Sequence, residues 1–226
     1  MKKIFLILSV VLCLGIMLSG CDCSGKKEVD YLSHVSELRS EVYEGSSKDY
    51  TLKASYGFRE TPYINDGKVG KQVYYLTFEM NNVTNLDLTY FLNFTHDGQT
   101  YEKQFNLNHH RSALSCEIEI NEFKENSFTV SVGTLNEKQE IIMQNAIPEN
   151  SLDYKGAINA LIKSQPALLD NYKDENGEFC AEIYARILVK DGKAYWYIGI
   201  ANGNGGLKAM LIDGKTGEIL AVREVF

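Results

Sequence analysis

The sequence predicts an α+β protein with two folded parts. The first, an antiparallel β-sandwich, is indicated by a series of short segments in which apolar and polar residues alternate, with turn residues between them. The second, one helix packed on an antiparallel sheet, is indicated by helical spacing at residues 154–162 and by the alternating segments that follow. Because a helix can cover one face of such a sheet, this second part can bury its own core.

The folded chain is expected to begin with a short helix over residues 31–43. Leu32, Val35, Leu38 and Val42 recur there at the spacing of one helix face. After residue 50 the apolar period changes to two, which is typical of a half-buried strand. The region that follows is therefore predicted to be β-rich.

The clearest strand of this region is 74–80, where every second residue is apolar. Asn65-Asp66-Gly67 and His96-Asp97-Gly98 predict hairpin turns, because Asn, Asp and Gly tolerate positive φ. Strands at intervals of roughly ten residues, with no helix between them, predict a sandwich of immunoglobulin-like type. The strands expected are 74–80, 86–94, 101–107, 114–120, 128–132 and 140–144.

A second domain is predicted to begin at residue 149. The turn-forming sequence Pro-Glu-Asn-Ser at 148–151 ends the sandwich domain, 31–148, and the helical pattern that follows stops before Pro166. The domain 149–226 then consists of this helix and a meander of strands. The strands expected are 179–189, 193–201, 207–213 and 218–225.

The turn between the last two strands reads Asp-Gly-Lys-Thr-Gly-Glu over residues 213–218. Asp213 can accept backbone N–H bonds across the bend, and Gly217 can adopt the left-handed conformation that closes such turns. With the helix and the Tyr-Trp-Tyr strand at 195–197, this stretch resembles the PepSY family over residues 152–226, although Gly214 departs from the usual alanine. The resemblance implies a non-enzymatic module linked to protease propeptides and to binding or inhibition of envelope peptidases.

One face of the C-terminal sheet is predicted to bind a partner. Tyr195 and Tyr197 share a side of their strand, and Tyr184, Arg186 and Met210 on neighbouring strands are candidates for the same surface. Tyr, Arg and Met are enriched in the cores of protein interfaces. The alternative is that this face packs against the helix or the sandwich domain.

Residues 1–21 have the pattern expected of a signal peptide. Lys2 and Lys3 precede an apolar run at 4–17, and small residues ending in Gly20 precede Cys21. The run is too short to be a clear membrane span, which needs about 20 apolar residues.

This pattern resembles bacterial lipoprotein signal peptides. The resemblance implies cleavage between Gly20 and Cys21 and attachment of acyl chains, such as palmitate, to the Cys21 thiol. Residues 1–20 are then the signal peptide and 21–30 a tether, and the protein is expected on the extracytoplasmic side of the bacterial cell membrane. The alternative is an ordinary secretory signal.

The charge of the chain argues against nucleic acid as a partner. The sequence has 23 Lys and Arg against 30 Asp and Glu, a net charge of −7, and loss of the signal peptide leaves 21 against 30, or −9. Binding to nucleic acid requires a positive surface that displaces counterions. Contact with the membrane is therefore expected through the lipid anchor.

No catalytic or metal-binding motif is predicted. His109 and His110 are adjacent, so in an extended segment they point to opposite faces and cannot easily share a metal. Cys116 lies at an apolar position of its strand and is expected in the core, while Cys23 and Cys180 are taken as free thiols. The segments 174–177 and 203–208 lack, respectively, the carboxylates of a calcium loop and the Gly-Lys-Ser/Thr ending of a phosphate loop.

The function predicted from the sequence is a non-enzymatic, lipid-anchored module that binds a peptide or an envelope protein, including a peptidase that it restrains. No cofactor is expected. Two alternatives remain open, a hydrolase that uses unidentified carboxylates and a structural spacer.

Overall fold

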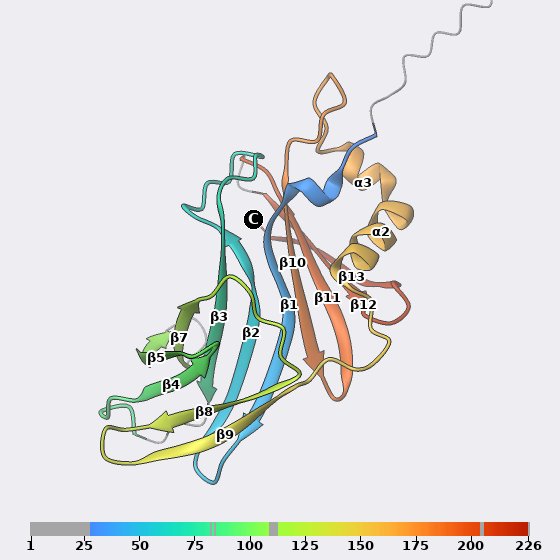
Figure 1. Ribbon diagram of the computed structural model, residues 1–226. Coiled ribbons are helices and arrows are strands. Elements are labelled where there is room, and N and C mark those ends of the chain that lie inside the picture. Colours follow the sequence, from blue (N-terminus) through green and yellow to red (C-terminus); the bar gives the residue numbers. More distant parts are fainter. Residues whose placement is uncertain (1–27, 82, 84, 109–112, 204–205, 226) are drawn as a thin grey trace, which may run out of the picture.

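The computed structural model describes residues 28–226 except 82, 84, 109–112, 204–205 and 226 (Figure 1). The described chain is mostly antiparallel β-sheet, as predicted, with short helices. Its elements are η1 (Tyr31–His34), β1 (Val35–Ser46), β2 (Thr51–Glu60), β3 (Gln72–Asn81), β4 (Phe91–His96), β5 (Gln99–Gln104), β6 (Asn106–Asn108), β7 (Ala113–Glu119), β8 (Ser127–Gly133), β9 (Lys138–Asn145), α2 (Tyr154–Ser164), α3 (Pro166–Asp170), β10 (Glu182–Lys190), β11 (Lys193–Ala201), β12 (Leu207–Asp213) and β13 (Ile219–Val225).

All the strands of the described chain belong to one sheet, with the main order β13-β12-β11-β10-β1-β2-β3-β7-β6. β1 joins its two halves. The first part of β1 pairs with β10 in parallel, and its last part pairs with β9 in antiparallel fashion. The two predicted domains therefore share a strand.

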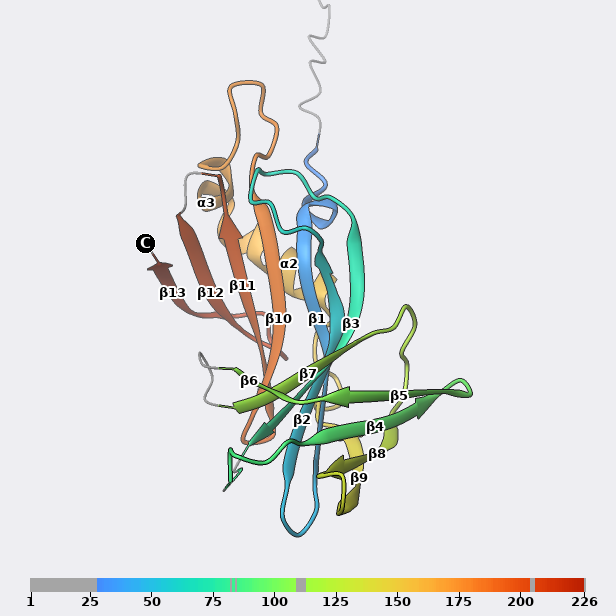
Figure 2. The same cartoon turned by 90° about the vertical axis from the view of Figure 1, so that its left-hand side faces the viewer.

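Strands β1–β9 curl into a nearly closed barrel. β9 pairs with β8, β8 with β4 and β4 with β5, while β6, which follows β5 directly, pairs with β7. Figure 2 shows the shorter strands crossing the lower part of β1–β3. The barrel encloses an aromatic-rich core that includes Tyr43, Phe78, Phe94 and Phe123, all of them buried.

Helices α2 and α3 cover one face of β10–β13 (Figure 1). The helix α2 begins where predicted, because Asp153 caps it by accepting a 2.7 Å hydrogen bond from the Gly156 N–H. The core beneath the helices contains Leu161, Trp196 and Ile198. Val35 and Leu38 of β1 also pack in this second core.

The predicted helix at 31–43 is wrong, since a 3-10 helix covers Tyr31–His34 and the rest is β1. The pairing of β1 is irregular between Val35 and Glu37 and between Arg39 and Glu41. A β-bulge inserts an extra residue, so Val35 and Leu38, three positions apart, can pack in the same core, and the half-buried Val42 also packs against it. These bulges imitate the apolar spacing of a helix.

Two further local predictions had different outcomes. His96-Asp97-Gly98 forms the hairpin between β4 and β5, with positive φ at Asp97 (48°) and Gly98 (75°). The strand predicted at 86–94 begins only at Phe91, and Leu86 and Leu88 are exposed in the preceding turn. Without a buried face, alternation in the sequence alone does not make a strand.

The other predicted hairpin, Asn65-Asp66-Gly67, lies within a longer connection between β2 and β3, residues 61–71, named loop 61–71 below.

The turn between β12 and β13 has the contacts predicted for it. Asp213 Oδ1 accepts hydrogen bonds from the N–H groups of Lys215 (2.9 Å) and Thr216 (2.8 Å), and Gly217 has φ 76°. No helix within the described ranges is long and apolar enough to cross a bilayer.

Candidate functional site

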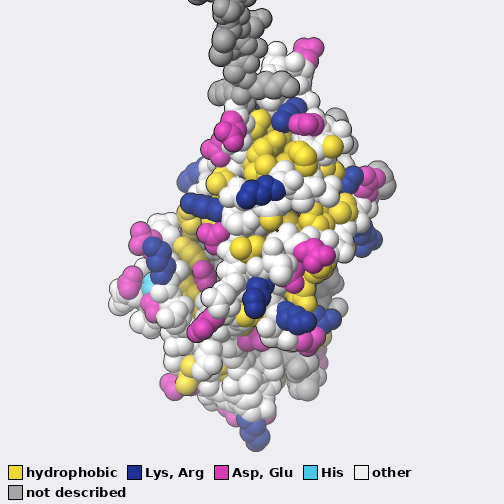
Figure 3. All heavy atoms as spheres, turned by 90° about the vertical axis from the view of Figure 1, so that its right-hand side faces the viewer, with side chains coloured by type: hydrophobic (Ala, Val, Ile, Leu, Met, Phe, Trp, Pro, Cys, Tyr) yellow, Lys and Arg dark blue, Asp and Glu magenta, His cyan; other side chains and the backbone are white. Residues whose placement is uncertain are grey.

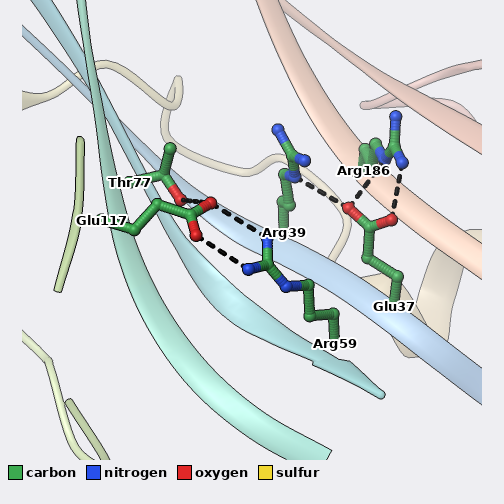
Figure 4. Close-up of polar contacts among 6 residues, drawn as sticks. All are labelled: Glu37, Arg39, Arg59, Thr77, Glu117 and Arg186. Carbon is green, nitrogen blue, oxygen red and sulfur yellow. Dashed lines mark hydrogen bonds and ion pairs between the residues drawn. The ribbon is translucent and has the colours of Figure 1, made fainter. Parts of the chain in front are cut away.

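The face of the sheet opposite the two cores, named the outer face, carries a continuous row of charged and aromatic side chains. In the strand register Arg59 of β2 pairs with Glu37 of β1, and Arg39 of β1 pairs with Arg186 of β10. Arg186 pairs in turn with Tyr197 of β11. Because side chains alternate between faces, these residues project from the same side of neighbouring strands. Figure 4 shows Glu37, Arg39, Arg59 and Arg186 of this row.

Glu37 is the centre of this row. Its carboxylate accepts hydrogen bonds of 3.0 and 2.6 Å from Arg186 and of 2.9 Å from Arg39. Burial of Glu37, whose side chain is 14% exposed, raises the pKa, but hydrogen bonds and positive charge from Arg186 and Arg39 outweigh burial and hold the pKa below its usual value. The carboxylate therefore fixes the two guanidinium groups in place.

A second ion pair continues the row toward the barrel. Arg59 donates two hydrogen bonds, of 2.9 and 2.7 Å, to Glu117 of β7, and Thr77 Oγ1 donates another of 3.3 Å (Figure 4). The Arg59 guanidinium also lies 4.3 Å from the centre of the Tyr75 ring. Planar stacking and bidentate pairing hold this arginine in a single orientation.

A cavity opens on the outer face where β1 separates from β10. The two strands pair only as far as Arg39 and Arg186, after which β1 turns toward β9. The opening, named the fork cavity, has a volume of about 320 Å³. Its lining includes Arg39, Val42, Arg186, Leu188 and Tyr197.

A second cavity, named the loop cavity, adjoins the fork cavity and lies beside loop 61–71. It has a volume of about 360 Å³ and shares Arg186 and Tyr197 with the fork cavity. Its lining also includes Glu60, Tyr63 and Tyr184. Together the two cavities form a groove with polar anchors and aromatic walls, the composition expected of a binding site.

Four of the five residues predicted to bind a partner lie on the outer face. The register aligns Arg186 with Tyr197 and places Tyr184 and Tyr195 on the same side of β10 and β11. Met210 does not belong to this set: it pairs with Ile198, is 1% exposed and packs in the core under the helices. The sequence does not determine the register of β12, which decides on which face Met210 lies.

Tyr184 is more enclosed than expected of a contact residue. It is buried, and its hydroxyl lies 2.6 Å from the Tyr63 hydroxyl and donates a 3.4 Å hydrogen bond to Glu182. Burial and the hydrogen bond to Tyr63 raise the pKa of Tyr184, so its hydroxyl stays protonated. Tyr184 therefore forms a buried part of the wall of the loop cavity.

Glu37, Arg39 and Arg59 were not predicted as site residues. Glu37 and Arg39 fell in the segment predicted to be a helix, and Arg59 fell in the predicted sandwich domain. The charged residues at alternate positions 37 and 39, and the arginine at 59, were the sequence features that could have indicated this site. Only the pairing of β1 with β10 shows that this part of β1 lies beside Arg186.

The opposite side of the C-terminal sheet has a different surface. Figure 3 shows hydrophobic side chains gathered on the side of the molecule that carries the helices. Leu220 and Val222 of the edge strand β13 are exposed. These residues lie outside the groove and provide control positions for tests of it.

Several other predicted features can be placed. Cys116 is in the barrel core, as predicted, and burial raises the pKa of its thiol to about 12, so it is not a nucleophile at neutral pH. Cys180 is an exposed free thiol. Gly20, Cys21, Cys23 and the pair His109 and His110 lie outside the described residues. Within the described part, no three His, Cys, Asp or Glu side chains are grouped to hold a metal ion.

Comparison with models of known protein families, with curated proteins and with solved structures found no match for this chain.

Proposed function

We propose that this chain is a lipid-anchored, non-enzymatic binding module of the bacterial cell envelope, which holds an extended peptide segment of a partner protein in the groove of its outer face. The observation that carries the proposal is the fork cavity. It combines a free strand edge with preorganised arginines and an aromatic wall.

The free edge belongs to the second half of β10. Over Ile187–Lys190 this strand pairs with β11 on one side, while in the described chain no strand pairs with it on the side of β1. Unpaired N–H and C=O groups of an edge can form a ladder with an added strand. Ile187, Leu188 and Val189 line the fork cavity, so a peptide there would lie beside this edge.

The side chains around the edge suit a peptide ligand. Arg186 and Arg39 are held by Glu37 before any ligand arrives, and Tyr197 forms an adjacent aromatic wall. Such preorganisation lowers the entropy lost on binding. Aromatic and arginine side chains are the usual anchors of protein interfaces.

The location and the family relationship are parts of the same proposal. The acylated residue is Cys21, which would hold the module at the membrane surface. The helix and strands of residues 152–226 are proposed to form a PepSY-like module, and residues 31–148 an immunoglobulin-like unit, which would make an envelope peptidase a suitable partner. The net charge of −7 supports a partner other than nucleic acid.

The proposal can be tested by selecting peptides from a random displayed library with the full chain in non-ionic detergent. Leu188→Glu places a charge in the fork cavity and should weaken binding of the selected peptides at least tenfold, about 1.4 kcal/mol. Leu220→Glu is a matched control, because Leu188 (45%) and Leu220 (46%) are equally exposed but Leu220 lies on β13.

Each other outcome identifies a different function. Binding that resists Leu188→Glu would place the peptide elsewhere and contradict the proposal. Cleavage of bound peptides would favour the hydrolase. A library that yields no binder would favour the structural spacer.

A further inference from the structure

Loop 61–71 folds across the end of the sheet and is hydrogen-bonded to β10 and to the residue that follows β11. The N–H groups of Asp66 and Gly67 donate to Glu182 Oε1 at 3.1 and 3.3 Å, and Asn65 Nδ2 donates to the Asn202 carbonyl at 2.9 Å. Gly67 has φ 82°, and a Cβ there would lie 2.8 Å from the Cys180 carbonyl oxygen. Glycine thus allows the loop to lie this close to the sheet.

Two buried carboxylates lie near this loop. Glu182 is fully buried and accepts hydrogen bonds from the loop backbone and from Tyr184. Glu60, 6% exposed, accepts a 2.9 Å hydrogen bond from the Gly70 N–H at Oε1, but its Oε2 is buried without a partner. Within the described chain, neither carboxylate forms an ion pair with Lys or Arg.

This arrangement is unfavourable in the absence of a ligand. Burial raises the pKa of Glu60, the Gly70 N–H lowers it, and the charge of nearby Glu182 raises it further. An unsatisfied buried charge is costly, and proteins normally pair it or bind a counterion to it. Glu60 lines the loop cavity, so its carboxylate lies beside the space that a ligand would occupy.

The rest of the lining provides a second acceptor and aromatic walls. The hydroxyls of Tyr63 and Tyr184 lie 2.6 Å apart, and either can donate to the other. A hydroxyl oxygen has two lone pairs, so in either case the Tyr63 oxygen keeps at least one for a donor in the cavity. The rings of Tyr63, Tyr184 and Tyr197 line the same space and can surround an alkyl chain that ends in a cation.

We propose that the loop cavity binds the side chain of a lysine, with its ammonium group on Glu60 Oε2 and the Tyr63 oxygen and its alkyl stem against the tyrosine rings. The choice of lysine over arginine follows from the single free oxygen of Glu60. A guanidinium is best matched by both oxygens of a carboxylate, whereas an ammonium acts as a point charge. The inference rests on the proposed function, because the lysine would belong to the peptide in the adjoining fork cavity.

The test uses Nα-acetyl-lysine methylamide as the probe, with the full chain in non-ionic detergent and saturation-transfer NMR as the measurement. The norleucine analogue has an alkyl side chain without the charge, and the arginine analogue carries the same charge on a planar guanidinium group. The lysine probe should bind at least tenfold more tightly than either. Glu60→Gln should remove this preference.

Two variants separate binding from stability. Tyr63→Phe removes the acceptor oxygen of an exposed side chain and also its hydrogen bond to Tyr184. It should weaken the lysine probe severalfold, while the protein stays folded with a melting temperature only slightly lower. Glu140→Gln makes the same charge change as Glu60→Gln at an exposed position of β9 and should leave binding intact.

The proposal is overturned if the lysine and norleucine probes bind equally, or if folded Glu60→Gln keeps the preference for lysine. Suppose that either result is found, but selected peptides still bind the wild-type protein and fail to bind Leu188→Glu. Then only the lysine site is wrong, and the proposed function stands. If the lysine probe binds but no peptide does, the lysine site stands and the proposed function falls.

Discussion

Glu37 and Arg186 are 149 residues apart in the sequence, yet two hydrogen bonds, of 3.0 and 2.6 Å, join them across the parallel pair β1 and β10. This contact connects the strand that begins the barrel with the strand that begins the C-terminal sheet. It also orients the arginine shared by both cavities of the groove. A single ion pair thus links the stability of the sheet to the geometry of the candidate site.

Glu37→Gln should destabilise the protein by about 2 kcal/mol, because it removes charge-assisted hydrogen bonds from a largely buried acceptor. Glu117→Gln is the matched control. Glu117 makes a similar bidentate pair with Arg59, but its side chain is 36% exposed and its loss should cost about 1 kcal/mol or less. Urea unfolding of both variants measures the difference, and equal losses would contradict it.

The same pair should make stability depend on pH. The pKa of Glu37 is lower in the folded protein than its ordinary value of 4.5, so the unfolded chain binds the proton more readily. The stabilisation is therefore complete above the unfolded pKa and is lost as pH falls through the folded pKa. The difference in unfolding free energy between the wild-type protein and Glu37→Gln should be large at pH 7 and should shrink at more acidic pH. A difference that is constant with pH would exclude this role.

The strands could be predicted from the sequence where each had one buried face. The residues of β3 and of β10–β12 alternate because one side meets a core, and the hairpin at 96–98 has the residue types that its positive φ angles require. These are local properties, determined by neighbours within a few residues. The residues Tyr184, Arg186, Tyr195 and Tyr197 could be grouped on the same basis.

The long-range pairings could not be predicted in this way. The parallel contact of β1 with β10 has no turn to indicate it, and the bulges in β1 allow Val35, Leu38 and Val42, which have the spacing of a helix face, to pack against one core. The closure of the barrel depends likewise on β9 returning to β1. The half of the site contributed by Glu37, Arg39 and Arg59 follows from these pairings alone.

Replacing Tyr195 and Tyr197 together by Ser should weaken binding of selected peptides by about 2 kcal/mol, since aromatic anchors often contribute this much. Both rings lie on the outer face, so the melting temperature should change little. Met210→Ala is the contrasting variant, because it opens a cavity in the core and should cost about 2–5 kcal/mol of stability. A double tyrosine variant that melts much earlier but retains its peptide would show that these rings serve packing.

The fragment 149–226 should fold poorly alone. The core under its helices includes Val35 and Leu38 of β1, which are 1% and 6% exposed in the whole chain, and β10 would lose its parallel partner. Circular dichroism should show a weak or absent thermal transition for the fragment, and mixing with residues 28–148 should restore a cooperative one. A cooperative transition of the isolated fragment at the melting temperature of the whole chain would contradict this dependence.

Cys21→Ser should leave the protein without lipid and uncut by the lipoprotein signal peptidase, because it removes the thiol that we propose to be acylated. Each buried methylene contributes about 0.8 kcal/mol, so two or three acyl chains anchor a protein stably whereas one binds only marginally. Cys23→Ser is the matched control and should remain lipidated, since Cys23 lies two residues beyond the predicted cut. Mass spectrometry of the mature N-terminus measures both variants. An unmodified wild-type N-terminus at any residue other than Cys21 would remove the lipid anchor from the proposed function and leave the groove of the outer face to be explained in a secreted protein.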